Sequence, residues 1–306
     1  MIEPETYRKG KQRMAVPPSK LMGPILLITD LSPRCDRAMD RAVIMAKLHQ
    51  VKLIVLHVVE TPWLTKLAQP AWRSMQAEQQ VIAQQQVRQD LTNVDVEFEV
   101  RVENGNPIDV ICGVAAELEC ALIVTGTARD ETLGRMVIGT TVERLARRCD
   151  TPLLIVRMRP FKPYDKIAIA TDFSEGSRHA LETAIDLLPQ TQVALFHAFD
   201  EVAGIYDLDE PTLKEQCAVR QKLALGFAES TQALQGKPTP TIAVEHGSAE
   251  HRLPNFVDTN GIELVVLGTH GVTGLVRTAM GSVAEKILSA LRCDALVVRQ
   301  PYTPDT

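Results

Sequence analysis

Apolar and polar residues follow two different periods along this chain. Short, nearly continuous apolar runs alternate with longer segments in which apolar residues recur every three or four positions. The first pattern is typical of strands buried on both faces, and the second of helices with one buried side. In the first half of the chain the pattern predicts strands over 24–30, 51–58, 94–102, 121–126 and 152–157, and helices over 36–48, 74–92, 107–118 and 140–148.

The second half of the chain repeats this alternation. It predicts strands over 166–171, 192–198, 240–245, 263–268 and 295–299, and helices over 177–188, 211–234, 249–259 and 282–291. Because buried strands separated by helices run parallel with right-handed crossovers, helices should cover both faces of the sheet. Each half is therefore predicted to be a doubly wound, Rossmann-like α/β domain with a five-stranded parallel sheet.

An internal repeat relates the two halves. Residues 25–32 (Ile-Leu-Leu-Ile-Thr-Asp-Leu-Ser) match residues 167–174 (Ile-Ala-Ile-Ala-Thr-Asp-Phe-Ser) at an offset of 142 positions. The same offset relates Glu103/Glu245, Gly126/Gly268, Gly139/Gly281, Glu143/Glu285 and Arg157/Arg299. We therefore expect two tandem domains, 22–158 and 164–301, here called the first copy and the second copy. Two prolines in the segment 158–164 favour a short extended connection between them.

Composition and charge narrow the class of protein. Of 306 residues, 45% are hydrophobic and 23% are charged, which indicates a globular chain rather than a disordered one. No apolar run approaches the roughly 20 residues that span a bilayer, and the basic first twenty residues lack the apolar core of a secretory signal. A net charge of −5 gives no support for nucleic-acid binding. We therefore expect a cytoplasmic protein that binds neither membranes nor nucleic acids.

The cysteines and histidines give no sign of a metal centre. The six cysteines show neither a C-x-x-C pair nor zinc-ligand spacing: Cys35, Cys112, Cys120, Cys149, Cys217 and Cys293. Scattered single cysteines suit a reducing compartment, so we expect small, buried, free thiols, with a redox sensor as the open alternative. His246, His251 and His270 also lack the spacing of metal ligands.

Glycines cluster after the fourth strand of the second copy. Ligands of open parallel sheets bind beyond the carboxyl ends of the strands, where this chain places Thr171-Asp172, Ala198 and Gly268. The segment 268–282 carries four glycines and ends at Ser282, which is predicted to be the N-cap of the next helix. Glycines let backbone N–H groups approach a phosphate, and a helix N-terminus favours an anion. The sequence therefore predicts a phosphate-binding loop built from backbone.

This loop differs from two common phosphate-binding motifs and resembles a third. No lysine follows the glycines as in a Walker A loop, and no G-x-G-x-x-G fingerprint follows the first strand. The spacing Gly268-x2-Gly271-x9-Gly281-Ser282 instead resembles the ATP-binding motif of universal stress proteins. Further matches to that family are Ala170-Thr-Asp-Phe-Ser174, His197-Ala198, Glu245-His246-Gly247 and the last strand, 293–299. The resemblance covers about residues 23–158 and 164–300, in a tandem arrangement known in the family.

The resemblance implies that the second copy binds ATP, with or without Mg²⁺. Asp172 and the neighbouring Ala170 and Thr171 would lie beside the ribose and adenine. Ala198 would touch the adenine, where the family often has valine, and Leu267 would supply main-chain contacts. The other residues that the resemblance places around the ribose and phosphates are Gly268, Gly271, Gly281, Ser282 and Val283. His270 lies in the same loop, where it either meets the phosphates or is simply exposed.

The first copy departs from this motif. Arg129 stands where the second copy has Gly271, and Asp130 and Glu131 follow it. A side chain then fills space that the phosphates need, and the two carboxylates repel a polyphosphate. We therefore predict that the first copy does not bind ATP, the alternative being that the Arg129 guanidinium holds a phosphate.

Four other side chains have structural explanations as well as functional ones. Asp30 and Asp172 could be N-terminal caps of the helices that follow them. His57 and His197 end apolar strands, and such histidines are more often hydrogen-bonded core residues than ligands or bases. An aspartate after the first strand is also typical of receiver domains, but the acidic cluster and lysine of those domains are missing from the other strand ends.

Three functions follow from these observations. The favoured one is a nucleotide-binding stress or regulatory protein with an unidentified protein partner and at most slow ATP hydrolysis. The others are a weak ATPase or nucleotidyl-transfer enzyme, which would need a catalytic basic loop not seen in the sequence, and a nucleotide-free interaction module. The final strands, Pro152–Arg157 and Ala295–Arg299, are apolar, and the resemblance implies that this strand pairs between two subunits in single-domain members of the family. We therefore expect the two strands to pair antiparallel within this chain as a pseudo-dimer, leaving a further homodimer open.

Overall fold

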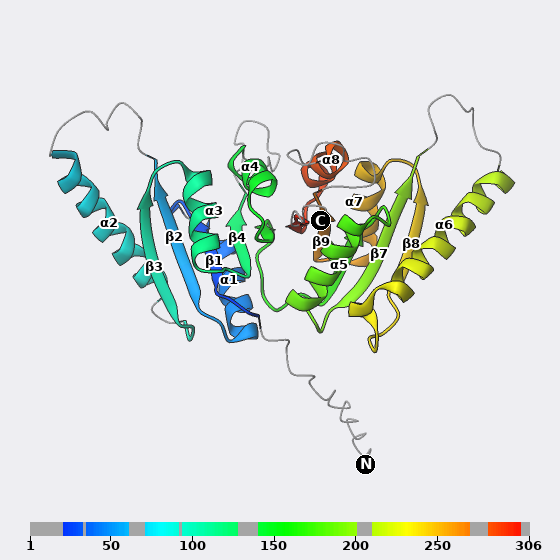
Figure 1. The fold of residues 1–306 in the computed structure, drawn as a ribbon, viewed down its shortest axis with the longest axis horizontal. Coiled ribbons are helices and arrows are strands. Elements are labelled where there is room, and N and C mark those ends of the chain that lie inside the picture. Colours follow the sequence, from blue (N-terminus) through cyan, green and yellow to red (C-terminus); the bar gives the residue numbers. More distant parts are fainter. Residues whose placement is uncertain are drawn as a thin grey trace, which may run out of the picture.

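The computed structural model describes residues 21–32, 35–60, 71–91, 94–127, 140–200, 210–269 and 281–300. In these residues strands and helices alternate through both copies (Figure 1). The first copy contains β1 (Ile25–Thr29), α1 (Asp36–His49), β2 (Leu53–Val59), α2 (Ala71–Asp90), β3 (Phe98–Asn104), α3 (Pro107–Glu117), β4 (Leu122–Gly126), α4 (Thr140–Arg148) and β5 (Leu153–Val156). The second copy contains β6 (Lys166–Ala170), α5 (Glu175–Leu187), β7 (Gln192–Phe199), α6 (Glu210–Ser230), β8 (Thr241–His246), α7 (Ala249–Asn260), β9 (Leu264–Gly268), α8 (Ser282–Ala290) and β10 (Asp294–Val298).

All these strands join one ten-stranded sheet in the order β3-β2-β1-β4-β5-β10-β9-β6-β7-β8. Neighbouring strands within each copy are parallel, in the order of a doubly wound fold. At the centre β5 and β10 pair antiparallel, with Ile155 opposite Ala295 and Leu153 opposite Val297. The predicted fold class is thereby confirmed, including the intrachain pseudo-dimer with its two final strands adjacent.

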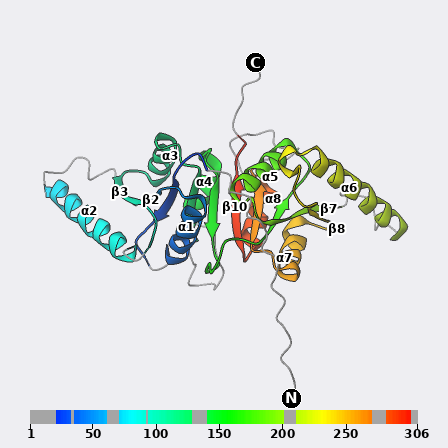
Figure 2. The ribbon, with the colours of Figure 1, turned by 90° about the horizontal axis from the view of Figure 1, so that it is seen from below.

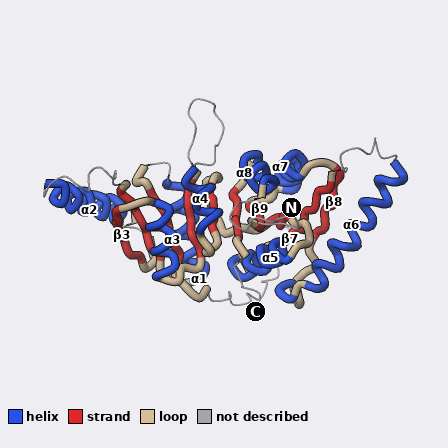
Figure 3. Tube along the Cα trace, turned by 45° about the horizontal axis from the view of Figure 1, so that its top comes forward, coloured by secondary structure: helices blue, strands red, loops and turns tan. Residues whose placement is uncertain are grey.

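Two apolar layers hold the helices on the two faces of the sheet. One layer contains α1, α5 and the buried end of α6, and the other contains α3, α4, α7 and α8. Each layer draws residues from both copies, so the hydrophobic core continues across the β5–β10 junction. Seen from below and in the tilted view, α2 and α6 lie at the two ends of this continuous body (Figures 2 and 3).

Some element boundaries differ from those expected from the sequence. Strand β3 begins at Phe98 rather than 94, because Val94 and Val96 pack against the core without joining the strand ladder. Helix α6 ends at Ser230, and the expected remainder becomes a short 3-10 helix over Gln232–Leu234. None of the described helices combines the length and apolar character that crossing a bilayer requires.

A buried polar cluster locks the junction between the copies. The Asp294 carboxylate, which is fully buried, accepts hydrogen bonds from the Tyr164 hydroxyl at 2.6 Å and from the backbone N–H groups of Arg157 and Met158 at 2.7 and 2.9 Å. The Arg41 guanidinium lies 3.6 Å from the same carboxylate and 3.7 Å from the Tyr164 ring centroid. A buried charge is tolerated only when it is paired and hydrogen-bonded, as it is here.

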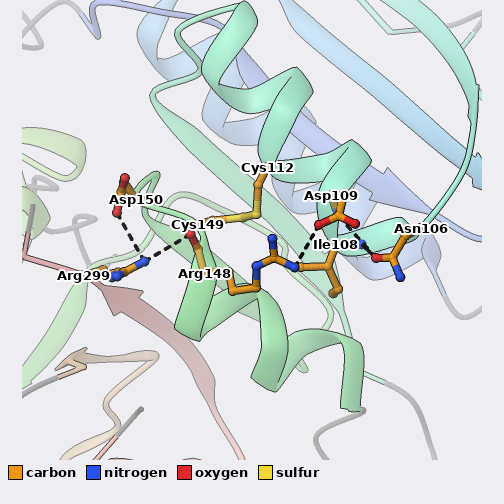
Figure 4. Close-up of a disulfide and its surroundings, with 8 residues drawn as sticks. All are labelled: Asn106, Ile108, Asp109, Cys112, Arg148, Cys149, Asp150 and Arg299. Atoms are coloured by element: carbon orange, nitrogen blue, oxygen red, sulfur yellow. Dashed lines mark hydrogen bonds and ion pairs between the residues drawn. A yellow bond between two sulfur atoms is a disulfide. The ribbon is translucent and has the colours of Figure 1, made fainter. Parts of the chain in front are cut away.

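Two cysteines contradict the expectation that all six are free. Cys112 on α3 and Cys149, directly after α4, form a disulfide with their Cα atoms 5.3 Å apart (Figure 4). The four free thiols are Cys35, Cys120, Cys217 and Cys293. The pairing left no sign in the sequence because 37 positions separate the two residues, and only the packing of α3 against α4 brings them together.

Candidate functional site

The turn after β6 is shaped by its own side chains. The Thr171 hydroxyl accepts a hydrogen bond from the Phe173 N–H at 2.9 Å, and Phe173 has a left-handed φ of 65°. The exposed Asp172 carboxylate accepts from the Ser174 N–H at 3.1 Å and from its hydroxyl at 2.5 Å. Ser174, rather than Asp172, is the N-cap of α5, since its hydroxyl accepts from the Ser177 N–H. Asp172 therefore projects from the strand end as an exposed carboxylate in a fixed turn.

His197 on the neighbouring strand β7 holds this turn through a hydrogen bond. Its Nδ1 lies 2.8 Å from the Thr171 carbonyl oxygen, which can only accept, so Nδ1 carries the hydrogen. The ring lies 4.4 Å from the Phe173 ring, and burial lowers the pKa of His197 below its ordinary value. His197 is thus a hydrogen-bonded structural histidine, as its place at the end of an apolar strand indicated.

Gly268 ends β9 against the first turn of α5. A Cβ atom at this position would lie 3.1 Å from the Gly176 carbonyl oxygen and 3.2 Å from its carbonyl carbon. Two backbones approach each other here at a distance that leaves little room for a side chain, so the glycine is required by packing.

Helix α8 begins directly opposite this strand end. The N-cap is Gly281, and Ser282 is the first helical residue, which corrects the prediction that Ser282 is the cap. The Gly281 N–H donates to the Thr269 carbonyl oxygen at 3.0 Å and so joins the two ends of the glycine loop. His270 and Gly271 lie outside the described residues. The N-terminus of α8, whose first N–H groups have no acceptor within the helix, is thereby fixed beside the carboxyl end of β9.

These elements enclose a cavity of about 320 Å³ at the point where the strand order of the second copy reverses. Nine of the eleven residues expected at the site line it: Ala170, Thr171, Asp172, Ala198, Leu267, Gly268, Gly281, Ser282 and Val283. Seven further residues of the described part of the chain also line it: Ser177, Phe196, His197, Ala249, Thr269, Ala284 and Ile287. The volume lies at the lower end of the range of small-molecule sites.

The lining that the sequence missed comes mostly from the helices. Ala249 and Ala284 belong to the first turns of α7 and α8, and Ile287 to the second turn of α8, so their contribution depends on how these helices rotate onto the sheet. Phe196 could have been found from strand alternation, because it lies two residues before Ala198 and so faces the same side. The strand ends themselves were located by the general rule for parallel sheets.

The cavity lining combines an apolar wall with two polar features, a carboxylate and the N-terminus of a helix. Alanines at 170, 198, 249 and 284 leave a hollow on the face covered by α7 and α8. Asp172 stands on one side, and the N-terminus of α8 stands on the other. Among the described residues no group of three or more His, Cys, Asp or Glu could hold a metal ion. The arrangement suits a flat apolar group inside, hydroxyl groups at the carboxylate and an anion at the helix end.

The first copy builds the same turn but fills the adjoining space. Leu31 has a φ of 63°, its N–H donates to the Thr29 hydroxyl at 3.0 Å, and His57 Nδ1 lies 3.0 Å from the Thr29 carbonyl oxygen. The Asp30 carboxylate accepts from the Ser32 N–H and from the Cys35 thiol. Burial acts to raise the pKa of Asp30, but these hydrogen bonds outweigh it and the pKa lies below its ordinary value.

Branched side chains occupy the first-copy positions that correspond to three alanines of the cavity. Ile28, Val58 and Val142 stand where the second copy has Ala170, Ala198 and Ala284, and all three pack in the apolar layer on that face. Arg129, Asp130 and Glu131, on which the sequence argument for the first copy rested, lie outside the described residues. The prediction that this copy does not bind ATP therefore stays a prediction, now with a second physical reason.

The fold and cleft define a class: a duplicated, doubly wound α/β protein with a ligand-sized cleft at a strand switch point. A model of the Universal stress protein family matches residues 22–157 and 163–299. The chain belongs to the universal stress protein family, with two copies of the family unit in tandem.

Relatives and solved structures agree with this assignment. Universal stress protein Rv2005c of Mycobacterium tuberculosis is 25% identical over 294 residues, covering 90% of this chain and 97% of the relative. A universal stress protein from Archaeoglobus fulgidus has a TM-score of 0.66 at 16% identity, covering 90% of this chain and 98% of that one. The putative universal stress protein from Pseudomonas aeruginosa UCBPP-PA14 has a TM-score of 0.62 at 20% identity, covering 92% of this chain and 94% of that one. These two structures share the fold.

Proposed function

We propose that the chain is a nucleotide-binding regulatory protein that holds one ATP, in the cleft of the second copy. The observation that carries this proposal is the cleft itself. An alanine-walled cavity of about 320 Å³ lies between an exposed carboxylate and the N-terminus of a helix at the switch point of a parallel sheet. These three features match the three parts of a nucleotide.

Each part of the nucleotide has a chemically suited surface in this arrangement. The adenine would lie against Ala170, Ala198 and the main chain at Leu267. The Asp172 carboxylate would accept hydrogen bonds from the ribose hydroxyls. The phosphates would extend along the glycine loop to Ser282 and Val283 at the start of α8, where backbone N–H groups and the helix dipole favour negative charge.

Magnesium ion does not require a protein cage in this proposal. Mg²⁺ keeps several waters and is commonly held by substrate phosphates with one or two carboxylates. An ion bound to the ATP phosphates would therefore enter with the nucleotide.

Titration calorimetry with MgATP tests the proposal on the full chain. We expect saturation near one nucleotide per chain, because the first copy has Ile28, Val58 and Val142 where alanines line the cleft of the second copy. Asp172→Ala should weaken binding by about 1.5–3 kcal/mol, the usual size of a hydrogen bond to a charged group. Asp30→Ala, the matched control in the first copy, should leave the affinity for MgATP unchanged.

The same experiment separates the alternative functions. No heat of binding with MgATP would contradict the proposal and favour a nucleotide-free interaction module. Two equivalent sites would contradict the assignment to the second copy. Incubation of the complex with analysis of ADP and phosphate tests for hydrolysis, and a binding protein should show at most slow turnover.

A further inference from the structure

The Cys112–Cys149 disulfide lies where the first copy contacts the second (Figure 4). Cys149 directly follows α4, and both of its neighbours in the chain contact Arg299, the residue after β10. The Arg299 guanidinium donates a hydrogen bond to the Arg148 carbonyl oxygen at 3.1 Å and lies 3.4 Å from the Asp150 carboxylate. The disulfide therefore restrains the segment 148–150, which contacts Arg299 of the second copy.

A second contact leads from this segment to the nucleotide cleft. The Arg147 guanidinium, two residues before Cys149, forms an ion pair with Glu285 on α8. Glu285 follows Ala284 and precedes Ile287, and both of these residues line the cavity. The end of α4 thus contacts the helix that forms one wall of the cleft.

The second copy has no counterpart of the Cys112–Cys149 disulfide. The corresponding residues of the second copy are Pro254 inside α7 and Leu291 after α8, neither of which can form a disulfide. Without the disulfide, α3 and α4 would still share the apolar layer through residues such as Ile111 and Leu145. They would also keep the Arg148–Asp109 ion pair at 2.8 Å, but both of its side chains are 60% exposed and such pairs contribute little to stability.

Two of the four free cysteines, Cys120 and Cys293, are poorly suited to compete for this pairing. Burial raises the pKa of Cys120 to about 11 and that of Cys293 to about 12, so both stay as unreactive thiols near neutral pH. Cys112 is only half-buried, whereas Cys149 is buried. Cys112 is therefore the sulfur that a small oxidant or a thiol can reach.

We propose that Cys112 and Cys149 form a reversible redox site whose state sets how firmly α4 is packed against α8. Oxidation by hydrogen peroxide begins when the Cys112 thiolate attacks one peroxide oxygen, the O–O bond breaks and the released hydroxide leaves as water after taking up a proton. The Cys149 thiol then attacks the Cys112 sulfenic acid, the S–O bond breaks and a second water forms. Two thiols and one H₂O₂ give one disulfide and two waters.

Reduction returns the pair through ordinary thiol exchange. A small thiol such as glutathione attacks Cys112 and releases the Cys149 thiol, and a second glutathione then releases Cys112 with formation of glutathione disulfide. Oxidation should then restrain α8, which forms one wall of the cleft, and so raise the affinity for the nucleotide. This consequence rests on the proposed function.

The redox step is tested first, by equilibrating the full chain in glutathione buffers and counting alkylated cysteines by mass spectrometry. We expect two thiols to appear and disappear together, and peptide mapping should place them at 112 and 149. Cys112→Ser should remove the transition, whereas Cys217→Ser, a free half-buried thiol on α6, should leave it intact. A pair that stays oxidised at every buffer ratio, or never oxidises with peroxide, would overturn the proposal.

The coupling to α8 is tested by hydrogen exchange without any nucleotide. Amides of residues 283–290 should exchange about three-fold faster in the reduced protein, while those of α6 should not change. Glu285→Gln removes the ion pair and should make α8 exchange equally in both redox states. Equal exchange in both states of the unmodified chain would overturn the coupling.

MgATP titration of the two redox states completes the test. We expect about three-fold weaker binding after reduction. If neither state binds MgATP, the proposed function fails, while hydrogen exchange still decides the redox site. If both states bind MgATP equally, the proposed function stands, and the proposed effect of the disulfide on the cleft is wrong.

Discussion

The first strand of each copy ends in the same turn, and the two turns agree in their hydrogen bonds. Thr29 and Thr171 each accept from the N–H two residues later, that residue has a left-handed φ in both copies, and a strand histidine meets the threonine carbonyl. Beside the turn the copies differ. One has three alanines around a cavity, and the other has an isoleucine and two valines in the same places.

This difference shows which features of the duplicated fold are free to change. The turn is part of the sheet, because it satisfies backbone groups at the end of a buried strand. The volume beside it depends on a few methyl groups and can be filled without disturbing the ladder, since interiors close around branched side chains as readily as around a ligand. The same turn can therefore stand beside alanines in one copy and beside branched side chains in the other.

The largest expected effect concerns the junction, where the copies are also unequal. Asp294 accepts from Tyr164 and lies beside Arg41, whereas Pro152 occupies the corresponding position in the first copy. Asp294→Ala removes the carboxylate beside the buried Arg41 guanidinium, which keeps only its uncharged contacts to the Lys162 carbonyl oxygen and the Tyr164 ring, and it removes the acceptor of the Arg157 and Met158 N–H groups. The free energy of unfolding should therefore fall by about 3–5 kcal/mol. Urea denaturation followed by circular dichroism measures this loss.

Two controls decide whether the loss belongs to the cluster. Asp258→Ala removes an exposed aspartate from α7 and should change stability by less than about 0.5 kcal/mol. Tyr164→Phe removes one hydrogen bond to the carboxylate and should cost about 2 kcal/mol. A small effect of Asp294→Ala would mean that β-strand pairing and the apolar layers alone hold the copies together.

The next effect in size tests the three alanines. The triple variant Ala170→Ile, Ala198→Val and Ala284→Val gives the second copy the side chains of the first. Because the added methyl groups occupy the cavity, MgATP affinity should fall at least about 100-fold, or about 2.7 kcal/mol. Calorimetry measures the affinity, and a retained cooperative thermal transition shows that the fold persists.

The reverse exchange sharpens the comparison between the copies. Ile28→Ala, Val58→Ala and Val142→Ala open the first copy, but Arg129 and the two acids after it remain in the loop. We expect the variant to lose stability through the cavities created and still to bind one MgATP per chain. A second nucleotide in this variant would show that side-chain volume alone, rather than the loop sequence, closes the first copy.

The fold could be predicted from the sequence to a large extent, for a physical reason. Strands buried on both faces must be apolar along their whole length, so the inner strands were located nearly in full, and the edge strand β8 was found from its alternation. Edge strand β3 was placed four residues too early at its start, because its half-exposed alternation continues through Val94 and Val96 outside the ladder. The final strands were correctly paired because both are short and apolar, and because the short segment 158–164 keeps the two copies close together.

The site was predicted less completely, and its errors share one cause. Strand ends converge by topology, so Thr171, Asp172 and Gly268 could be placed together without coordinates. The contribution of Ala284 and the N-cap at Gly281 depend on where α8 begins and how it turns toward the sheet. The disulfide likewise depends on the packing of two helices, which residue spacing does not encode.

The smallest expected effect concerns the histidine behind the turn. Burial lowers the pKa of His197 in the folded protein below the ordinary value of 6.5, so the folded chain resists protonation at a pH where the unfolded chain accepts it. Stability should therefore be complete above about pH 6.5, fall as the pH drops through that value, and level off below the folded pKa.

His197→Asn isolates this contribution because an asparagine amide can still donate to the Thr171 carbonyl oxygen but does not titrate. Urea midpoints measured between about pH 7.5 and pH 5 should decline less steeply in the variant than in the unmodified chain, since one of the groups that makes the unfolded state bind more protons has been removed. Parallel declines would mean that other groups set the pH dependence. In that case the bond from His197 to Thr171 holds the turn equally well in both charge states, as expected for a nitrogen that carries its hydrogen in each.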